Sequence, residues 1–244
     1  MYHRFYTNCE TDFRRTGSLR ASFGGIHPEV LRLMTRTIIA VGGFSSGVGK
    51  TTLMCELLRA FPGWEAIKMT RGHYRSCGKD PHACCVSHLL SDEPVIRAGR
   101  DETYAPGKDT GRYWDAGASN VQWVIVTDTQ VEQGIKRALE RTQATGVFVE
   151  GTSFQQYVDV DYAVMVARPE VKQLKPSARR ALQKADALYL FDDEMNEATA
   201  RERFHAWRET STAGSTLGDM PVYTRDDLTR LVAAIEAVHA GVVA

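Results

Sequence analysis

The sequence predicts an α/β fold in which a mainly parallel sheet is covered by helices on both faces. Short apolar runs typical of buried strands alternate with segments whose apolar residues recur at helical spacing. A glycine-rich segment follows the first apolar run directly and precedes a helical pattern. The chain of 244 residues is 43% hydrophobic and 25% charged, which fits one α/β domain or two small ones. Together these features favour a three-layer sandwich.

The expected elements follow one another in strand–helix order. Strands are expected at residues 37–41, 64–70, 121–127, 146–149, 162–166, 187–191 and 221–223. Helices are expected at residues 53–61, 130–143, 176–184, 196–210 and 226–240. Residues 71–118 show little periodicity and are rich in Gly, Asp, Pro and Cys, so we expect a long functional loop or small insert after the second strand.

The glycine-rich segment has the pattern of a phosphate-binding loop. It reads Gly-Gly-Phe-Ser-Ser-Gly-Val-Gly-Lys-Thr-Thr from Gly42 to Thr52. Glycines let backbone N–H groups turn toward phosphate oxygens, and the following helix adds partial positive charge. In this pattern Lys50 reaches the β- and γ-phosphates and the Thr51 hydroxyl binds Mg²⁺. The predicted nucleotide-binding residues are Ser46, Gly47, Val48, Gly49, Lys50, Thr51 and Thr52.

The loop departs from the usual pattern at one position. Phe44 stands five residues before Gly49, where glycine is usual, and Gly43 lies one residue further out. The alternative interpretation is a glycine-rich turn that arose by chance. The position of the segment between a strand and a helix favours nucleotide binding.

Carboxylates follow two of the expected strands. Glu150 ends the apolar run 146–149, and a carboxylate there can hold Mg²⁺ opposite Thr51 because hard cations prefer oxygen ligands. Asp128 also follows a strand, but it suits a helix cap equally well. We therefore predict Glu150 as a metal-binding and catalytic residue and keep Asp128 as the rival.

A second polar cluster lies at Lys108, Asp109 and Arg112, beside Gly107 and Gly111. Two cations and a carboxylate next to glycines suit an anionic ligand, and arginine gives bidentate contacts. The alternative is a solvated loop. If an acceptor molecule binds here, Asp109 could serve as a general base that takes its proton.

Cysteine and histidine gather within residues 73–88. Cys77, Cys84, Cys85 and His88 offer thiolate and imidazole ligands of the kind that Zn²⁺ binds. The spacing matches no standard zinc motif. A redox pair, a metal-delivery site or simply buried cysteines are the alternatives.

Composition narrows the partners and the compartment. The chain carries 30 basic and 30 acidic residues, so no overall charge favours nucleic acid or a membrane surface. It has no apolar run long enough to span a bilayer and no secreted disulfide pattern, so we expect a cytoplasmic protein. Residues 1–36 form an arginine-rich N-terminal arm before the domain at 37–244. Met34 would be an ordinary start, so the residues before it are either an upstream extension or a packing arm.

Five motifs in this order resemble the molybdopterin-guanine dinucleotide biosynthesis protein B family of P-loop NTPases. They are the phosphate loop, Ala66-Ile67-Lys68 with His73, Pro106 to Ala118 with Gly107-Lys108-Asp109-Thr110 and Ala116-Gly117-Ala118, Phe148-Val149-Glu150-Gly151, and Met220-Pro221-Val222-Tyr223. The wider class includes dethiobiotin synthetase, the septum-site ATPases and nickel-insertion GTPases. The cysteine-containing segment is not a feature of this family.

The resemblance implies an Mg²⁺-dependent protein that binds GTP or ATP, hydrolyses it slowly and serves molybdenum-cofactor maturation. Lys108, Asp109 and Arg112 would bind a second small-molecule ligand, with a cofactor-biosynthesis protein as a further partner and a homodimer as one arrangement left open. Two other functions remain open from the sequence. They are a P-loop small-molecule kinase, and a nucleotide-gated metallochaperone that uses the cysteine and histidine cluster.

Overall fold

The computed structural model describes residues 36–72, 86–172, 174–192, 195–212 and 214–241. The chain divides into two units, Met1–Met34 and Thr35–Ala244, and all the described residues belong to the second.

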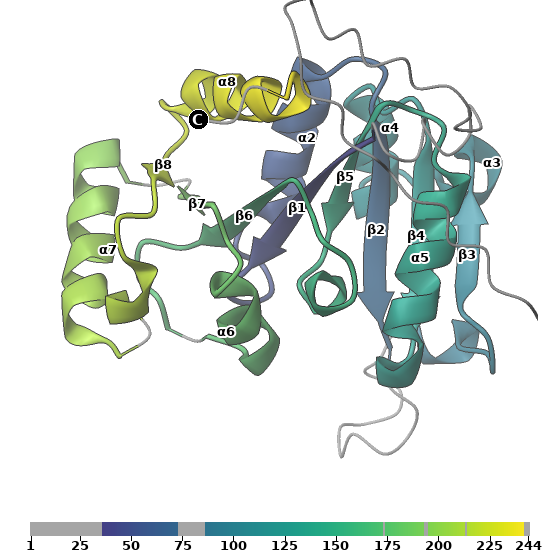
Figure 1. Cartoon of the computed structure of the whole chain (residues 1–244), viewed down its shortest axis with the longest axis horizontal. Helices are drawn as coiled ribbons and strands as arrows, with labels where there is room; N and C mark the ends of the chain where they lie inside the picture. Colours follow the sequence, from purple (N-terminus) through teal and green to yellow (C-terminus); the bar gives the residue numbers. More distant parts are fainter. Residues whose placement is uncertain (1–35, 73–85, 173, 193–194, 213, 242–244) are drawn as a thin grey trace, which may run out of the picture. The chain divides into compact units, whose positions relative to one another are not determined.

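An eight-stranded sheet forms the centre of the second unit, with strand order β3-β4-β2-β5-β1-β6-β7-β8 (Figure 1). The strands are β1 (Thr37–Gly43), β2 (Glu65–Arg71), β3 (Val95–Ala98), β4 (Val121–Val126), β5 (Gly146–Glu150), β6 (Tyr162–Ala167), β7 (Ala187–Leu190) and β8 (Val222–Tyr223). All neighbours pair in parallel except β3 and β4, which are antiparallel. The expected α/β fold with a mainly parallel sheet is confirmed.

Helices connect the strands. They are α2 (Lys50–Ala60), α3 (Arg100–Thr103), α4 (Asp109–Asp115), α5 (Val131–Arg141), α6 (Pro176–Leu182), α7 (Glu197–Thr210) and α8 (Leu228–His239). Short 3₁₀ turns are η2 (Ser87–Leu89), η3 (Asp128–Gln130), η4 (Ser153–Gln156) and η5 (Gly214–Leu217). Among these described helices, none is long and apolar enough to cross a membrane.

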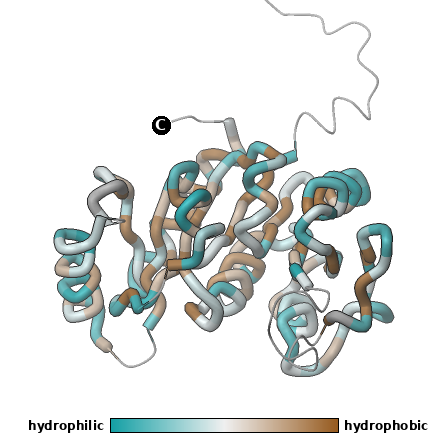
Figure 2. The backbone as a smooth tube through the Cα atoms, turned by 90° about the horizontal axis from the view of Figure 1, so that it is seen from below, coloured by the Kyte–Doolittle hydropathy of each residue, from teal (hydrophilic) through white to brown (hydrophobic). Residues whose placement is uncertain are grey.

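Successive residues of a strand point to opposite faces of the sheet, so the core is divided into clusters on its two sides. Ile39 and Val41 of β1 pack in the cluster that includes α2, α4 and α8, whereas Ala40 between them packs toward α5. Next to that second cluster, residues of β6 and β7 pack with α6 and α7. Figure 2 shows hydrophobic residues recurring along the strands and hydrophilic residues along the outer helices. The three layers therefore follow from strand alternation and helical periodicity.

Part of the expected unstructured stretch is regular. Residues 95–118 contain β3, α3 and α4, and β3 is an edge strand of the main sheet rather than part of a separate insert. The pattern did not predict β3 because it is short and all four of its residues are half-buried, which leaves no clear apolar alternation. Residues 73–85, which include Cys77, Cys84 and Cys85, lie outside the described residues.

Candidate functional site

A cavity of about 810 Å³ opens at the carboxyl ends of the central strands. The glycine-rich loop after β1, the end of β2, the first turn of α4, and the residues that follow β5, β6 and β7 all contribute to its wall. We call it the trench. Parallel strands place the residues after their carboxyl ends at one edge of the sheet, where α/β folds bind ligands.

The loop leaves the start of α2 open toward the trench. Gly47 and Gly49 have φ values of 70° and 94°, a left-handed conformation that favours glycine. Gly49 is the N-cap of α2, no side chain caps the helix, and its first turn holds no acid. The free N–H groups and the helix dipole therefore favour an anion at this point.

Lys50 turns back along the loop. Its Nζ donates to the carbonyl of Ser45 at 3.1 Å. A Cβ on Gly43 would lie 2.8 Å from Cδ of Lys50, so glycine at this position makes room for the lysine stem. Burial lowers the pKa of Lys50, against the opposing effect of Glu150, and the charges of Lys68 and Lys175 lower it further. Several cations thus converge at the loop, as an anion site requires.

Glu150 is the buried carboxylate of the trench, with 2% of its surface exposed. Three side chains donate to it: Thr51 Oγ1 to Oε2 at 3.0 Å, Lys68 Nζ to Oε1 at 2.5 Å, and the Tyr113 hydroxyl to Oε2. Burial and the adjacent carboxylate raise the pKa of Tyr113 well above its usual value, so the phenol stays a donor. The structure thus brings the predicted pair Thr51 and Glu150 together.

Lys68 joins Glu150 to Asp109. Its Nζ lies 2.6 Å from Oδ2 of Asp109 and 2.5 Å from Oε1 of Glu150. Burial alone would lower the pKa of Lys68, but the two carboxylates raise it overall. Burial would raise the pKa of Asp109, but Lys68 and the adjacent Thr51 hydroxyl lower it. Both groups are therefore charged at neutral pH.

Arg112 and Lys108, the other two members of the second polar cluster, lie in different places. Arg112 lines the trench, and its Nη2 donates to Thr52 Oγ1 at 3.3 Å. Lys108 is the exposed N-cap residue of α4 and is not part of the trench wall. Asp128 pairs with Arg71 at 3.0 Å and is not part of the wall either, so the geometry favours Glu150 over Asp128 as the metal-binding carboxylate.

Phe44 has a structural reason to replace glycine. Its side chain is 1% exposed and packs in the cluster of α6 and α7, with ring centroids 6.5 Å from Phe204 and 5.7 Å from Trp207. Phe44 therefore anchors the loop to the core instead of entering the trench.

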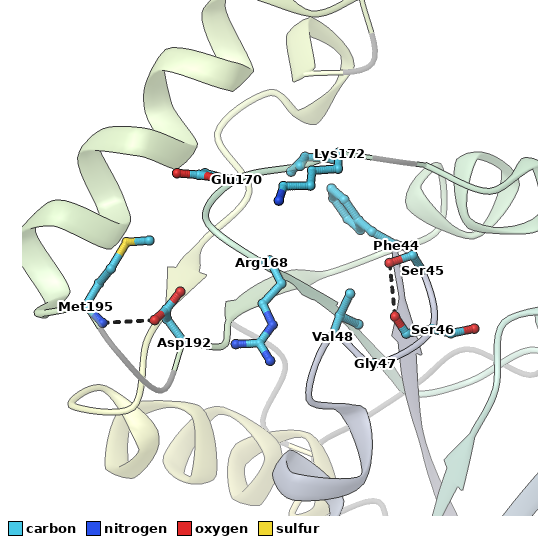
Figure 3. A pocket seen from close by; sticks show the side chains of 11 residues that line it. Phe44, Ser45, Ser46, Gly47, Val48, Arg168, Glu170, Lys172, Asp192 and Met195 are labelled. Atoms are coloured by element: carbon cyan, nitrogen blue, oxygen red, sulfur yellow. Dashed lines mark hydrogen bonds between the residues drawn. The ribbon is translucent and has the colours of Figure 1, made fainter.

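A second cavity of about 370 Å³ lies beside the loop and shares Ser45, Ser46, Gly47 and Arg168 with the trench. Figure 3 shows the side chain of Arg168 lying between Asp192 and Val48. Apolar side chains and charged groups of both signs line this cavity. They are Phe44, Val48, Val171, Met195, Arg168, Glu170, Lys172 and Asp192.

The zinc hypothesis rests on residues that the structure leaves undescribed. Cys77, Cys84 and Cys85 lie outside the described residues, and His88 is exposed in η2. Elsewhere in the described chain, no group of three His, Cys, Asp or Glu side chains is arranged to hold a metal ion.

Sequence reasoning did not assign roles to three residues of this site: Lys68, Tyr113 and Lys175. Lys68 had one signal, its place in the second half of the expected strand 64–70. Tyr113 and Lys175 had none, because the packing of α4 brings the buried Tyr113 to Glu150 and the start of α6 brings Lys175 to the trench wall.

Comparison with known proteins adds little to this geometry. No protein-family model matches the chain. No curated protein sequence matches it. One similar solved structure is that of HypB from Helicobacter pylori in complex with nickel, which is 13% identical. That match covers 88% of this chain and 94% of the other, with a TM-score of 0.45. A likeness of this degree carries no argument about ligand or activity.

Proposed function

We propose that this protein binds a nucleoside triphosphate, GTP or ATP, with Mg²⁺ and hydrolyses it slowly. The observation that carries the proposal is the hydrogen bond from Thr51 to the buried Glu150, directly beside the uncapped start of α2. A hydroxyl and a carboxylate at a helix N-terminus supply hard oxygen ligands next to an anion site.

The glycine-rich loop and the charged residues beside it then have distinct roles. The loop amides from Gly47 to Thr51 bind the phosphates, and Lys50 reaches the terminal pair. The donor set of Thr51, Glu150 and Asp109 fits Mg²⁺, because all three offer oxygen and Thr51 contacts both carboxylates. Bound Mg²⁺ would neutralise charge on the β- and γ-phosphates. Lys68 would then move away from one carboxylate, since it occupies the space between them.

We place the nucleoside in the second cavity. It adjoins the trench at Gly47 and Arg168, which line both cavities, so a bound nucleotide can extend from one cavity into the other. Apolar walls from Val48, Val171 and Met195 suit a base, and carboxylates can accept from the amino group that both adenine and guanine carry.

Slow hydrolysis follows from the state of the carboxylates. The two described carboxylates that line the trench, Asp109 and Glu150, are both paired with Lys68. A carboxylate whose pKa is lowered, as that of Asp109 is, is a weak general base. The same observation weakens the alternative of a small-molecule kinase in which Asp109 takes the acceptor proton.

A second small-molecule ligand fits the trench beyond the phosphate site. The wall continues past Lys68 to Met69, Thr70 and Arg71 at the end of β2, and Arg112 adds a second guanidinium. Two arginines favour an anionic ligand. This arrangement supports a role in cofactor maturation like that of the molybdopterin-guanine dinucleotide B family, whose motifs the sequence resembles.

The test is nucleotide binding and turnover of the wild type and Lys50→Ala. Calorimetry with ATP and GTP, each with Mg²⁺, should give micromolar binding to the wild type and at least about tenfold weaker binding to Lys50→Ala. Lys136→Ala is the matched control, since Lys136 is exposed on α5 and pairs with Glu132. Equal affinities of the wild type and Lys50→Ala would refute the proposal. Phosphate transfer to an added acceptor instead of water would favour the kinase.

A further inference from the structure

Lys175 reaches the glycine-rich loop from a distant part of the chain. It is the N-cap residue of α6, and its backbone N–H donates to the carbonyl of Phe44 at 3.1 Å. Its Nζ donates to Oγ of Ser46 at 2.8 Å, and its side chain forms part of the trench wall. Pro176 at the first helical position fixes the backbone where the side chain departs. The lysine is therefore held against the loop at both its backbone and its ammonium.

The two loop contacts place Lys175 near Lys50. Lys50 donates to the carbonyl of Ser45, and Lys175 donates to the hydroxyl of the next residue, Ser46. Because Lys50 serves the β- and γ-phosphates in loops of this type, the Ser45–Ser46 turn lies at the terminal-phosphate end of the site. Lys175 thus approaches that end from the side of α6, whereas Lys68 approaches from the side of β2.

The charge of Lys175 lacks a carboxylate partner among the described residues. No described Asp or Glu lies within ion-pair distance of its Nζ, in contrast to Lys68, which contacts both Asp109 and Glu150. The two ammonium groups repel each other, and without a counter-ion this repulsion raises the free energy of the folded protein. That cost is offset when an anion binds between the two ammonium groups.

We propose that Lys175 is a catalytic residue that contacts the terminal phosphate and stabilises it during transfer. The inference rests on the proposed function. In hydrolysis a water oxygen bonds to the γ-phosphorus, and the bond from phosphorus to the β–γ bridging oxygen breaks. That bond's electron pair stays on the nucleoside diphosphate, and the water proton passes to the released phosphate or solvent. Lys175 offsets the negative charge on the γ-phosphoryl oxygens, as an arginine finger supplied by the same chain does.

The alternative is that Lys175 only fixes the loop through Ser46. Three variants separate the two roles: Lys175→Met removes the cation, Lys175→Arg keeps it, and Ser46→Ala removes the loop hydrogen bond while leaving the cation. Lys136→Met, on the outer surface of α5, controls for charge loss. The assay measures single-turnover hydrolysis of ATP and GTP, together with affinities for the triphosphate, the diphosphate, and the diphosphate with aluminium fluoride as a mimic of the transferred phosphoryl group.

We expect Lys175→Met to slow turnover at least about 100-fold and to change diphosphate affinity less than about threefold. It should weaken triphosphate affinity and abolish binding of the diphosphate with aluminium fluoride. Lys175→Arg should keep most of the triphosphate affinity and most of the aluminium fluoride binding. Ser46→Ala should reduce the turnover rate less than about tenfold. Equal losses in Ser46→Ala and Lys175→Met, or a parallel loss of diphosphate affinity, would show a loop-fixing role and overturn the inference. If the wild type binds no nucleotide, the proposed function itself fails; if Lys50→Ala loses binding but Lys175→Met behaves like wild type, only this inference fails.

Discussion

Removing Lys68, the fourth of the seven residues of β2, should destabilise the protein far more than removing an exposed lysine would. Its Nζ is one of three donors to Glu150, whose side chain is only 2% exposed. Breaking a buried ion pair by deleting one partner costs about 3–5 kcal/mol. Because Tyr113 and Thr51 still donate to Glu150, we expect Lys68→Met to cost about 3 kcal/mol, near the lower end of that range.

A double-mutant cycle isolates the interaction. Glu150→Gln keeps an acceptor for Tyr113 and leaves Lys68 paired with Asp109, so it should cost only about 1–2 kcal/mol. The double variant contains no unpaired buried carboxylate and should lose about 2 kcal/mol, well below the sum of the two single losses.

Urea unfolding at pH 7 without nucleotide or Mg²⁺ gives the free energies of unfolding for this cycle. Circular dichroism of each variant checks that its secondary structure is intact. A coupling energy below about 0.5 kcal/mol would refute the reasoning, because additive losses would mean that Lys68 does not stabilise Glu150 in the folded state.

Three further predictions concern the loop and its neighbours. Phe44→Ala should lower the free energy of unfolding by about 3–5 kcal/mol in urea titrations, because it opens a cavity against Phe204 and Trp207; a loss under about 1 kcal/mol would contradict the packing. Gly49→Ala should weaken nucleotide binding at least about tenfold in calorimetry, because φ is 94° and the added Cβ would lie 2.2 Å from Cδ1 of Phe191; wild-type affinity would contradict this. Asp109→Asn should be less stable than wild type at pH 6–7. The lowered pKa of folded Asp109 means that its stabilising effect is present above the unfolded value of 3.8 and is lost as pH falls through the folded value, so urea titrations should show this difference shrinking in acid; a difference that is constant with pH would exclude the ion pair.

The sheet could be predicted from the sequence because its central strands are buried on both faces. Runs such as Val121–Val126 and Tyr162–Ala167 are nearly all apolar, and helical periodicity separates them. The edge strand β3 was missed because an exposed edge needs no apolar pattern. Strand order also required the structure, since nothing local in the chain states that β5 lies between β1 and β2.

The candidate site was predictable where its residues follow strands or belong to a motif. Thr51 and Glu150 fall in that group, and the parallel sheet brings them to one edge. Tyr113 of α4 contacts Glu150 from within the core, and Lys175, the N-cap residue of α6, lies in the trench wall, so their roles depend on how those helices pack. Residues that helix packing brings to a site have no fixed spacing in the sequence, so the sequence alone does not reveal them.

The direction of the Cα–Cβ bond at each loop position decides whether that position can carry a side chain. A Cβ at Gly43 would meet the stem of Lys50, whereas the side chain at Phe44 finds space in the core. The steric requirement for glycine has therefore moved one residue upstream from its usual place. A motif search with fixed spacing would reject this chain, although its loop keeps the open backbone on which the motif depends. Search patterns for such loops would recover more members if they scored the geometry of each position rather than its letter.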